Sequence, residues 1–253
     1  DACHVDAHTR PQKRYRWLAA DVQELCVRCH AGKTFKGSVQ HAPAKMRLCT
    51  TCHNPHVSEK KKLLLGELPL LCFDCHKPEG FMQKVRHSPV ADGSCTDCHF
   101  PHAGDNPKLL IDKKICFTCH DEAGIAGGKV VHPPVKEMRC TECHNPHSSP
   151  EEHLLVSAKI CFKCHKPAAF QGASVHSPVA KQNCVACHKP HQSDVPKLLS
   201  QDVPGLCFKC HDEKGFKGKK VVHVPVDSGE CLSCHSPHAG VAAPLLIDGK
   251  VCF

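Results

Sequence analysis

The sequence predicts a mostly irregular chain with short helices, built as an extended, quasi-one-dimensional array of repeats of about 45 residues. Three observations favour this fold class. Cysteine and histidine are abundant, with 22 and 23 residues in a chain of 253, and they recur at a near-constant interval. Large aromatic side chains are scarce, with one Trp, one Tyr and ten Phe. Side chains alone therefore offer too little material for a conventional core, so another body must form the centre of each repeat.

The recurring element is the motif Cys-x-x-Cys-His, which occurs complete ten times, with successive motifs 21 to 24 residues apart and alternate ones 44 to 47 apart. It is the attachment signature of c-type haem, in which two thiols bond to the porphyrin and the histidine binds the iron. The porphyrin would then be the core of each repeat. The predicted thioether cysteines of the complete motifs are Cys26, Cys29, Cys49, Cys52, Cys72, Cys75, Cys95, Cys98, Cys116, Cys119, Cys140, Cys143, Cys161, Cys164, Cys184, Cys187, Cys207, Cys210, Cys231 and Cys234.

The motifs alternate between two types, which we call A and B. A motifs begin at Cys26, Cys72, Cys116, Cys161 and Cys207. An aliphatic residue precedes each of them, and a large apolar residue stands nine positions after the first cysteine, at Phe35, Phe81, Ile125, Phe170 and Phe216. Each A motif is then followed by His-x-Pro, at His41, His87, His132, His176 and His223.

B motifs begin at Cys49, Cys95, Cys140, Cys184 and Cys231. Each continues as His-x-Pro-His, which places a further histidine at His56, His102, His147, His191 and His238. A Leu-Leu pair begins fourteen residues after the first cysteine, at 63, 109, 154, 198 and 245. We expect the repeated Phe and Leu positions to pack against porphyrin faces and edges.

Regular structure should be sparse, because proline stands close to nearly every additional histidine and interrupts long helices. We expect one or two helical turns around each Cys-x-x-Cys-His motif, where the i, i+3, i+4 spacing puts the three ligating groups on one face. Loops, with short ribbons, should connect these turns.

The histidine count predicts two axial imidazoles for every iron. The predicted proximal ligands are the motif histidines His4, His30, His53, His76, His99, His120, His144, His165, His188, His211 and His235. Eleven further histidines occupy repeat-equivalent positions and are the predicted distal ligands: His8, His41, His56, His87, His102, His132, His147, His176, His191, His223 and His238. His153 has no equivalent in the other repeats, and we expect it to be an ordinary surface residue.

The pairing of distal ligands with irons is partly predictable. His56 is three residues from His53, so both lie on nearly the same side of the local chain and cannot reach opposite faces of one porphyrin. The favoured hypothesis crosses the ligands within a repeat, with His56 on the A haem of Cys26 and Cys29, and His41 on the following B haem. The alternative sends His56 forward to the next A haem.

These patterns divide the chain into two-haem cassettes. The expected segments are 1–25, a truncated motif followed by an insertion; cassettes at 26–71, 72–115, 116–160, 161–206 and 207–251; and 252–253, the start of another cassette. Cys3-His4 and Cys252 resemble parts of motifs, so we expect ten complete haem c sites with truncated sites at both ends of a longer array.

Three other interpretations are weaker. Zinc ribbons use paired Cys-x-x-Cys but do not need a histidine directly after every second cysteine. A disulfide scaffold does not explain the histidines. Multihaem enzymes are the serious rival, but such enzymes carry a haem with a missing distal ligand or an altered motif, and every repeat here keeps both histidines. The sequence therefore favours conduction over catalysis, with no catalytic residue predicted.

The alternation of Leu-Cys-Phe-x-Cys-His, His-x-Pro-Val and Cys-x-x-Cys-His-x-Pro-His closely resembles the doubled Cys-x-x-Cys-His family of multihaem cytochromes c, over nearly the whole chain. That family includes periplasmic carriers, decahaem outer-membrane conduits and extracellular cytochromes of metal-respiring microbes, and related cytochromes polymerise into conductive filaments. The resemblance implies long-range electron transfer. The sequence departs from the pattern around His8, where one residue is added and the proline is missing.

The formal charge of +8 does not indicate a nucleic-acid partner. Ten haems with two propionates each would bring the oxidised assembly to about −2 and the reduced one to about −12. The lysines are better interpreted as propionate partners and solvated surface. One dense basic run, from Arg10 to Arg16, fits a solvated loop better than a docking patch.

Haem attachment by these motifs takes place outside the cytoplasm, so the protein should be exported. No apolar run approaches the roughly 18 residues of a membrane span. We expect an extracellular or cell-surface wire, with continuation of the array or self-association into a filament and with redox proteins or extracellular acceptors as partners. The alternative is a periplasmic carrier or an outer-membrane conduit.

Overall fold

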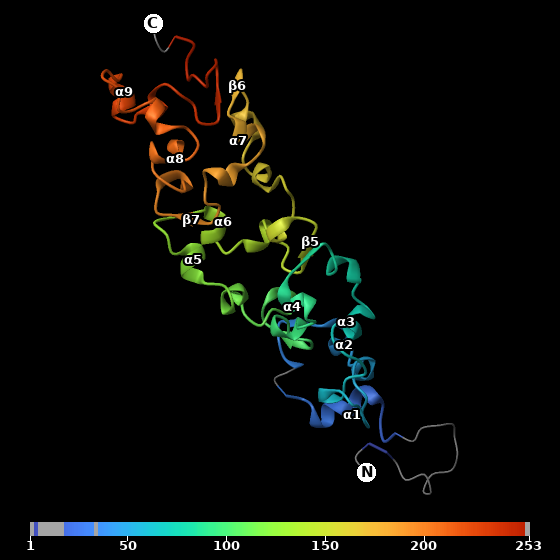
Figure 1. The fold of residues 1–253 in the computed structure, drawn as a ribbon. Helices are drawn as coiled ribbons and strands as arrows, with labels where there is room; N and C mark the ends of the chain where they lie inside the picture. The colour runs from blue at the N-terminus through green and yellow to red at the C-terminus, as the bar shows by residue number, and fades with distance from the viewer. Residues whose placement is uncertain (1–2, 5–17, 33–34, 251–253) are drawn as a thin grey trace. The chain divides into compact units, whose positions relative to one another are not determined.

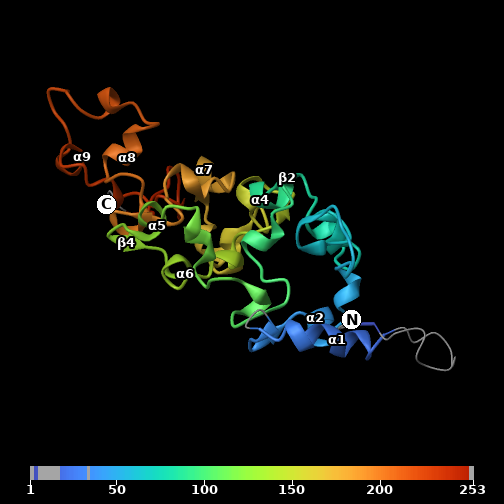
Figure 2. The ribbon, with the colours of Figure 1, turned by 90° about the horizontal axis from the view of Figure 1, so that it is seen from below.

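The computed structural model describes residues 3–4, 18–32 and 35–250, and it confirms a repeated fold of coil, short helices and small ladders (Figure 1 and Figure 2). The chain divides into two compact units. Unit 1 comprises Asp1–Cys119 and Pro146–Leu154, and unit 2 comprises His120–Asn145 and Leu155–Phe253. Each unit contains several copies of the same local structures, which we describe in turn.

The first recurring element is a helical turn through each Cys-x-x-Cys-His motif, as the sequence predicted. In every complete motif with a printed bond, the main-chain N–H of the histidine donates to the carbonyl of the first cysteine, as from His53 to Cys49 at 3.0 Å. A motifs form α1 (Val22–Cys29), α3 (Leu70–Phe73), α8 (Gly205–Phe208) and 3₁₀ turns at Ile115–Thr118 and Ile160–Lys163. B motifs form 3₁₀ turns at Cys49–Thr51, Cys95–Asp97, Cys140–Glu142, Cys184–Ala186 and Cys231–Ser233.

A second helical turn begins directly after the histidine of each His-x-Pro segment and contains the proline. These turns are α2 (Ala42–Lys45), α4 (Ser88–Ala91), α6 (Pro133–Lys136), α7 (Ser177–Ala180) and α9 (Val224–Asp227). These helices are short, as the prolines predicted, and each proline lies in the first turn, where its missing N–H costs nothing and its fixed φ favours helix. The histidine is the N-cap residue in extended conformation, as His41 shows at φ −65° and ψ 132°. Proline thus fixes the backbone directly after each of these histidines.

The remaining helical segments lie in two places. After B motifs, 3₁₀ turns cover the start of the Leu-Leu pair, at Lys61–Leu63, Pro107–Leu109, Glu152–Leu154 and Pro196–Leu198. The others lie between an A motif and its His-x-Pro. Cassette 3 has a short helix there, α5 (Glu122–Ala126), in which the Asp121 carboxylate accepts hydrogen bonds from the N–H groups of Ala123 and Gly124. Other cassettes have 3₁₀ turns at Pro78–Gly80, Pro167–Phe170 and Glu213–Gly215.

Two-residue strands join successive cassettes through antiparallel ladders. The strands are β1 (Val39–Gln40), β2 (Val85–Arg86), β3 (Ala103–Gly104), β4 (Val130–Val131), β5 (Ser148–Ser149), β6 (Ser174–Val175), β7 (Gln192–Ser193) and β8 (Ala239–Gly240). They pair as β1–β3 and β2–β5 in unit 1, and as β4–β7 and β6–β8 in unit 2. Each ladder pairs the strand before a His-x-Pro histidine with the strand after the His-x-Pro-His of the following cassette.

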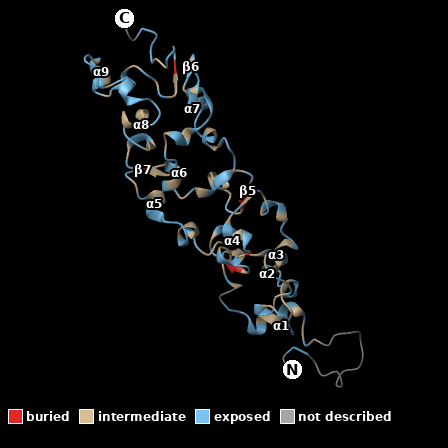
Figure 3. Cartoon of the chain, in the orientation of Figure 1, coloured by how far each residue is buried: buried red, intermediate tan, exposed pale blue. Residues whose placement is uncertain are grey.

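Side chains form almost no core. Among the described residues, the buried apolar side chains are Leu25 and Ala103, and Figure 3 shows intermediate and exposed colours nearly everywhere. The chain exposes 18661 Å², whereas a folded monomer of this mass exposes roughly 11,000 Å². The polypeptide is therefore a frame whose apolar interior must come from something other than its own side chains.

Candidate haem-ligand pairs

Histidine rings come together in pairs at a nearly constant separation. Eight pairs have ring centroids 5.8 to 6.3 Å apart: His4–His56, His41–His76, His53–His102, His99–His147, His132–His165, His144–His191, His176–His211 and His188–His238. Every pair combines one predicted proximal ligand with one predicted distal ligand. The structure thus brings the two histidine sets together one to one.

The separation fits an iron between the rings. A metal–imidazole bond is about 2 Å long and the nitrogen lies about 1.1 Å from the ring centre, so two axial imidazoles on one metal have centroids about 6 Å apart. Rings that touch directly are closer here, as in Phe35–His102 at 4.8 Å and Phe81–His147 at 4.7 Å. Two histidines alone are too few for a tetrahedral zinc site. No cluster of three or more His, Cys, Asp or Glu that could hold a metal ion occurs among the described residues.

Backbone carbonyls set the tautomer of one ring in several pairs. His41 Nδ1 lies 2.9 Å from the carbonyl oxygen of Pro101, and His53 Nδ1 lies 2.8 Å from that of Lys62. A carbonyl only accepts, so Nδ1 carries the proton and Nε2 is left with its lone pair, the state that binds a metal. The same contact occurs at His87, His99, His176, His188 and His235.

Burial favours the neutral form of four further rings among the predicted distal ligands. Burial lowers the pKa of His102, and the nearby His53 and His41 add to the effect. Burial also comes first among the causes that lower the pKa of His147, His191 and His238. His102 Nδ1 is buried without a hydrogen-bond partner among the described residues, although buried polar atoms are normally bonded. The lowered pKa of these four rings favours the uncharged state that a metal requires.

The hypothesis that ligands cross within a cassette is wrong for the pairs that the structure defines. It assigned His102 to the centre attached to Cys72 and Cys75, but His102 lies 6.0 Å from His53, and His76 lies 6.0 Å from His41. His56 likewise faces His4 rather than His30. The three-residue spacing correctly placed His56 and His53 in different histidine pairs. It gave no sign of the ladder between β1 and β3, which brings His102 of the next cassette to His53.

The histidine pairs instead form between neighbouring cassettes, through a unit that we call a junction: one ladder and the two predicted distal histidines beside it. At the first junction, β1 leads into His41 and β3 follows His102. The main-chain N–H of His41 donates to the carbonyl of His102 at 2.8 Å. His41 then faces the A site of cassette 2, and His102 faces the B site of cassette 1. At this junction, each of the two cassettes places one of its histidines at a site of the other.

The same main-chain bond recurs at the other ladders. The N–H groups of His87, His132 and His176 donate to the carbonyls of His147, His191 and His238 at 2.9 to 3.0 Å. The junction is therefore a repeated structure in which the positions of two distal histidines depend on each other.

A strained turn faces the predicted proximal histidine of several B sites. Lys62 and Leu63 both have left-handed backbone, with φ of 60° and 55°, and the same holds for Lys108 and Leu109. Such values cost about 1–2 kcal/mol per non-glycine residue. The turn aims the Lys62 carbonyl at His53 and the Lys108 carbonyl at His99. Strain at the Leu-Leu segment is therefore used to orient a predicted metal ligand.

His153 occupies the turn position that lysine holds in neighbouring repeats, with φ 56°, and its side chain is exposed, as the sequence predicted. Left-handed backbone at this position is a property of the turn, so the repeat accepts lysine or histidine there.

The cysteines of successive motifs are neighbours. Within cassettes, the first thiols of the A and B motifs are hydrogen-bonded in the pairs Cys26–Cys49, Cys72–Cys95, Cys161–Cys184 and Cys207–Cys231. Burial raises the pKa of Cys72 to about 11, and Cys95 adds to the shift. Between cassettes, electrostatic contacts link Cys52 with Cys75, Cys98 with Cys119, Cys143 with Cys161 and Cys164, and Cys187 with Cys207. The attachment points thus follow one another within each unit without a gap.

The repeated aromatic side chains lie beside the histidine pairs. Phe81, which we expected to pack against porphyrin, lies 5.6 Å from Phe73 between ring centroids, and it also contacts His147. Phe162 and Phe170 repeat this arrangement, with Phe170 against His238. The phenylalanine nine residues after an A motif therefore borders a distal ligand of the next cassette.

Sequence reasoning missed the small residues that form the junctions. Ser148 and Ser149 in β5 and Ser193 in β7 are buried, because the partner strand passes directly over them. The signal was present: the second residue after each His-x-Pro-His is Ser or Gly, at Ser58, Gly104, Ser149, Ser193 and Gly240. Valine before most His-x-Pro segments is the matching β-strand signal on the other side.

Other predicted site residues fall outside the pairs above or outside the described structure. His30, His87, His120, His223 and His235 stand at repeat-equivalent positions in the described part of the chain. His8, Cys252 and the basic run at 10–16 lie outside the described residues. Cys3 and the other described cysteines form no disulfide bond. None of the helices in the described ranges is long and apolar enough to cross a membrane.

Comparison with known proteins identifies one family. The family described as doubled CXXCH motif matches residues 41–81, 87–125, 132–170, 176–216 and 223–252, which together exceed half of the chain. Each of its five repeats begins at a His-x-Pro histidine. A comparison with curated proteins finds no match.

Proposed function

Because the chain belongs to the doubled CXXCH motif family, and is thus a multihaem electron-transfer cytochrome with covalently bound haem c, we propose that it conducts electrons over a long distance through a series of bis-histidine centres at its ten complete motifs, with neighbouring cassettes of the array supplying the second histidine of the first and last centres. The observation that carries the proposal is the unbroken succession of neighbouring attachment thiols within each unit. A protein whose haems worked independently would not need the thiols of each motif to lie beside those of the motifs before and after it. No residue is proposed as catalytic.

The proposed ligand sets follow from the ring pairs. The thiols of each motif would hold the porphyrin and the motif histidine would be the proximal ligand. The distal ligand of a B site would come from the His-x-Pro-His of the next cassette, and the distal ligand of an A site from the His-x-Pro of the cassette before. Haem c, when bound, supplies a one-electron iron couple whose potential depends on axial ligands and burial.

The protein's own contribution is to fix ligands and exclude competing ones. At each junction, a distal histidine has a ladder strand on one side in the chain and a proline on the other, and both restrict its backbone. Backbone carbonyls accept the Nδ1 proton of His41 and of His53. With both axial positions occupied by protein, exchange of electrons does not require bonds to form or break at these sites. Little reorganisation is then needed when a centre changes oxidation state.

The proposed setting is the cell exterior, as part of a wire or filament. Multihaem c-type cytochromes are usually exported, which supports either an extracellular or a periplasmic location. The reciprocal junction supports an array, because each cassette needs a neighbour on both sides to complete its histidine pairs. Partners would be further cassettes of the same kind, other redox proteins or extracellular acceptors.

Two measurements test the proposal. Electron paramagnetic resonance of the oxidised protein should show low-spin iron at the complete sites whose two histidines pair in the structure, and a film of the protein should conduct at potentials near those of its centres. Replacing Cys95 and Cys98 with serine removes one centre from the series and should lower the film conductance far more than it lowers the haem content. Equal losses of conductance and haem would contradict a serial path, and electron microscopy that shows discrete particles would contradict a filament.

A further inference from the structure

Positive charge gathers at one of the ten complete motifs, the A motif of cassette 4. Residues 156–170 run from five residues before its first cysteine to nine residues after it, and they contain Lys159, Lys163 and Lys166 but no Asp or Glu. The same window at the other nine motifs has a net charge of +2 at most, and it is −1 at the A motifs of cassettes 3 and 5. The A motif of cassette 4 is therefore the most cationic of the ten.

The charges of these lysines are not neutralised by carboxylates of the described chain. All three lysines are exposed, and none of them forms an ion pair with another described residue. Lys163 Nζ instead donates to the main-chain carbonyl of Glu142 at 3.5 Å. Lys163 stands between the two cysteines of the motif, and Lys166 directly follows the predicted proximal ligand His165. Pairing of either lysine with a haem propionate would still leave its charge close to the same iron.

The predicted distal ring at this site also differs from its equivalents. His132 faces His165, with ring centroids 6.3 Å apart. At the other junctions, Nδ1 of His41, His87 and His176 lies 2.9 to 3.0 Å from a proline carbonyl oxygen, but Nδ1 of His132 makes no hydrogen bond within the described ranges. A hydrogen bond at Nδ1 raises the basicity of a ligating histidine, and a more basic ligand stabilises ferric iron. The missing bond therefore favours the reduced state at this site.

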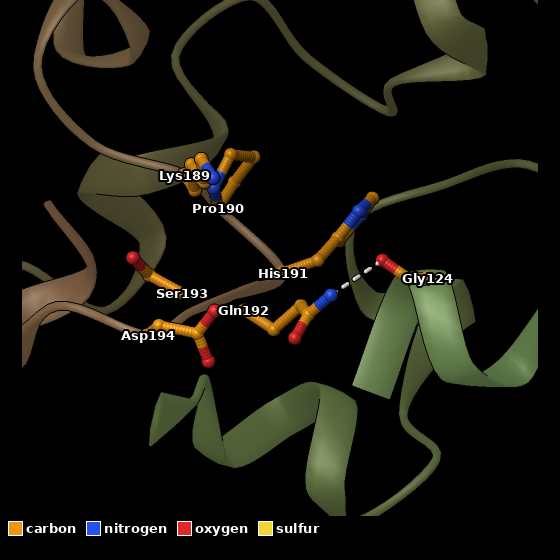
Figure 4. A pocket seen from close by; sticks show the side chains of 7 residues that line it. All are labelled: Gly124, Lys189, Pro190, His191, Gln192, Ser193 and Asp194. Atoms are coloured by element: carbon orange, nitrogen blue, oxygen red, sulfur yellow. Dashed lines mark hydrogen bonds between the residues drawn. The ribbon is translucent and has the colours of Figure 1, made fainter. Parts of the chain in front are cut away.

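The segment opposite His132 has a different hydrogen bond, which Figure 4 shows. The carbonyl of Pro190 corresponds to the acceptors at the other junctions. Two residues later, Gln192 Nε2 donates to the Gly124 carbonyl at 2.8 Å. The equivalent residues at the other ladders are smaller: Ala103, Ser148 and Ala239. A side chain thus links β7 to α5 at this junction, and the main-chain bond from His132 to His191 is kept.

We propose that Lys163, Lys166 and the unbonded Nδ1 of His132 give the haem attached to Cys161 and Cys164 the highest reduction potential of the ten, so that the first electron to enter the chain rests there. This inference rests on the proposed bis-histidine ligation and electron transfer. A unit positive charge about 10 Å from an iron favours its reduced form by roughly 2- to 20-fold, for effective dielectric constants from about 80 to about 20. No bond forms or breaks: the iron gains one electron, and the neighbouring haem that supplies it loses one. Cassette 4 is then an electron reservoir within the series.

A reductive titration of the oxidised holoprotein with dithionite, followed by absorption and electron paramagnetic resonance, tests the proposal. The variant Cys161→Ser/Cys164→Ser lacks one haem and should lose the component that is reduced first. The matched variant Cys72→Ser/Cys75→Ser lacks the haem of another A motif, and it should keep the first component and lose one that is reduced later.

Charge variants test the cause while all haems are kept. Lys163→Gln/Lys166→Gln should make the first component harder to reduce, by roughly 4-fold or more in the equilibrium between its oxidised and reduced forms. The matched control is Lys113→Gln/Lys114→Gln, which removes two lysines directly before the A motif of cassette 3. The control should leave the first component unchanged.

The outcomes separate the two proposals. Absent haem, or high-spin iron throughout the oxidised protein, would contradict the proposed function itself. Full haem content with low-spin iron, together with a first component that survives in Cys161→Ser/Cys164→Ser, would overturn this inference alone. If that cysteine variant does not fold, the lysine variants decide: a first component that stays in place in Lys163→Gln/Lys166→Gln, or that moves equally in the control, would also overturn it.

Discussion

At the scale of residues, histidines with similar sequence surroundings differ in the backbone hydrogen bond that they make. Some donate through their N–H and others accept through their carbonyl. His41 and His102 both stand beside His-x-Pro signatures, yet they face sites in opposite cassettes because one N–H is bonded to the other carbonyl. The local spacing predicted which residues are ligands. The partner of each ligand depends on contacts about 60 residues away in the chain, as between His41 and Pro101.

Replacing His102 with alanine should remove one axial imidazole from the haem on Cys49 and Cys52, whose proximal ligand is His53. A single low-spin centre should become high-spin, and electron paramagnetic resonance can count such centres. The double variant His102→Ala/His53→Ala should still affect one haem, because both ligands belong to the same iron.

The matched double variant is His102→Ala/His76→Ala, which should affect two haems. Ligand crossing within a cassette predicts the reverse, with His76 and His102 on one iron. If the His102/His76 double variant disturbs a single centre and the His102/His53 variant disturbs two, the junction assignment fails.

Acid should detach the distal histidines of B sites at an unusually low pH. Burial lowers the pKa of His102, His147, His191 and His238 from the ordinary 6.5. The unfolded chain then binds more protons than the folded one near pH 6.5, so the stability that these rings contribute is present above that pH and falls on acidification. The low-spin absorption spectrum should persist below pH 6.5 and convert to high-spin on further acidification. Conversion that is complete at pH 6.5 would contradict the prediction.

At the scale of elements, the helices and strands are very short, and the sequence predicts the helices better than the strands. The helical turns through the motifs were predictable, because the i, i+4 spacing of cysteine and histidine already describes one turn. The ladders were not, because two residues such as Ala103 and Gly104 show no alternation that could reveal a strand. Their pairing is also non-local. Small residues and valines marked the two strands, but the sequence alone does not reveal that they meet.

Gly37→Ala should disturb both haems served by the first junction. A Cβ at Gly37 would lie 2.5 Å from the Gly104 carbonyl oxygen, so β1 and β3 must separate, at a cost of about 1–3 kcal/mol. His41 and His102 would lose their shared main-chain bond. The low-spin signals of two centres should broaden or shift, and the denaturation midpoint should fall.

Gly32→Ala is the matched control, because a Cβ there meets nothing within 4 Å. It should leave the spectrum and the midpoint unchanged. Equal effects of the two substitutions would indicate that Gly37 acts through backbone freedom rather than through the ladder.

At the scale of the whole molecule, the polypeptide lacks the interior that normally stabilises a chain of 253 residues. The composition already predicted this, since the scarcity of large apolar residues left no other source for a core. The structure adds the reason that the frame still has a defined path: main-chain bonds at the turns and junctions fix it locally. Leu63, Leu65 and Leu70 remain largely exposed, where a protein with a conventional core would bury them.

The chain without haem should therefore not fold cooperatively. Expression in a host that lacks haem attachment should give a polypeptide with no sharp thermal transition and rapid cleavage by protease across the cassettes. Circular dichroism and limited proteolysis measure both properties. A haem-free chain that resists protease as well as the holoprotein does would show that side chains supply a sufficient core after all.

The reciprocal junction also bears on how such a chain can change length in evolution. The repeated family segments begin at the His-x-Pro histidines, such as His41 and His87, so a gene duplication from one of these to the next inserts a segment that enters and leaves through matching junctions. The new segment would receive distal histidines from its neighbours and supply its own to them without any further mutation. Insertions of half a cassette would leave two histidines facing the wrong type of site. Arrays of this kind should therefore grow and shrink in steps of two haems.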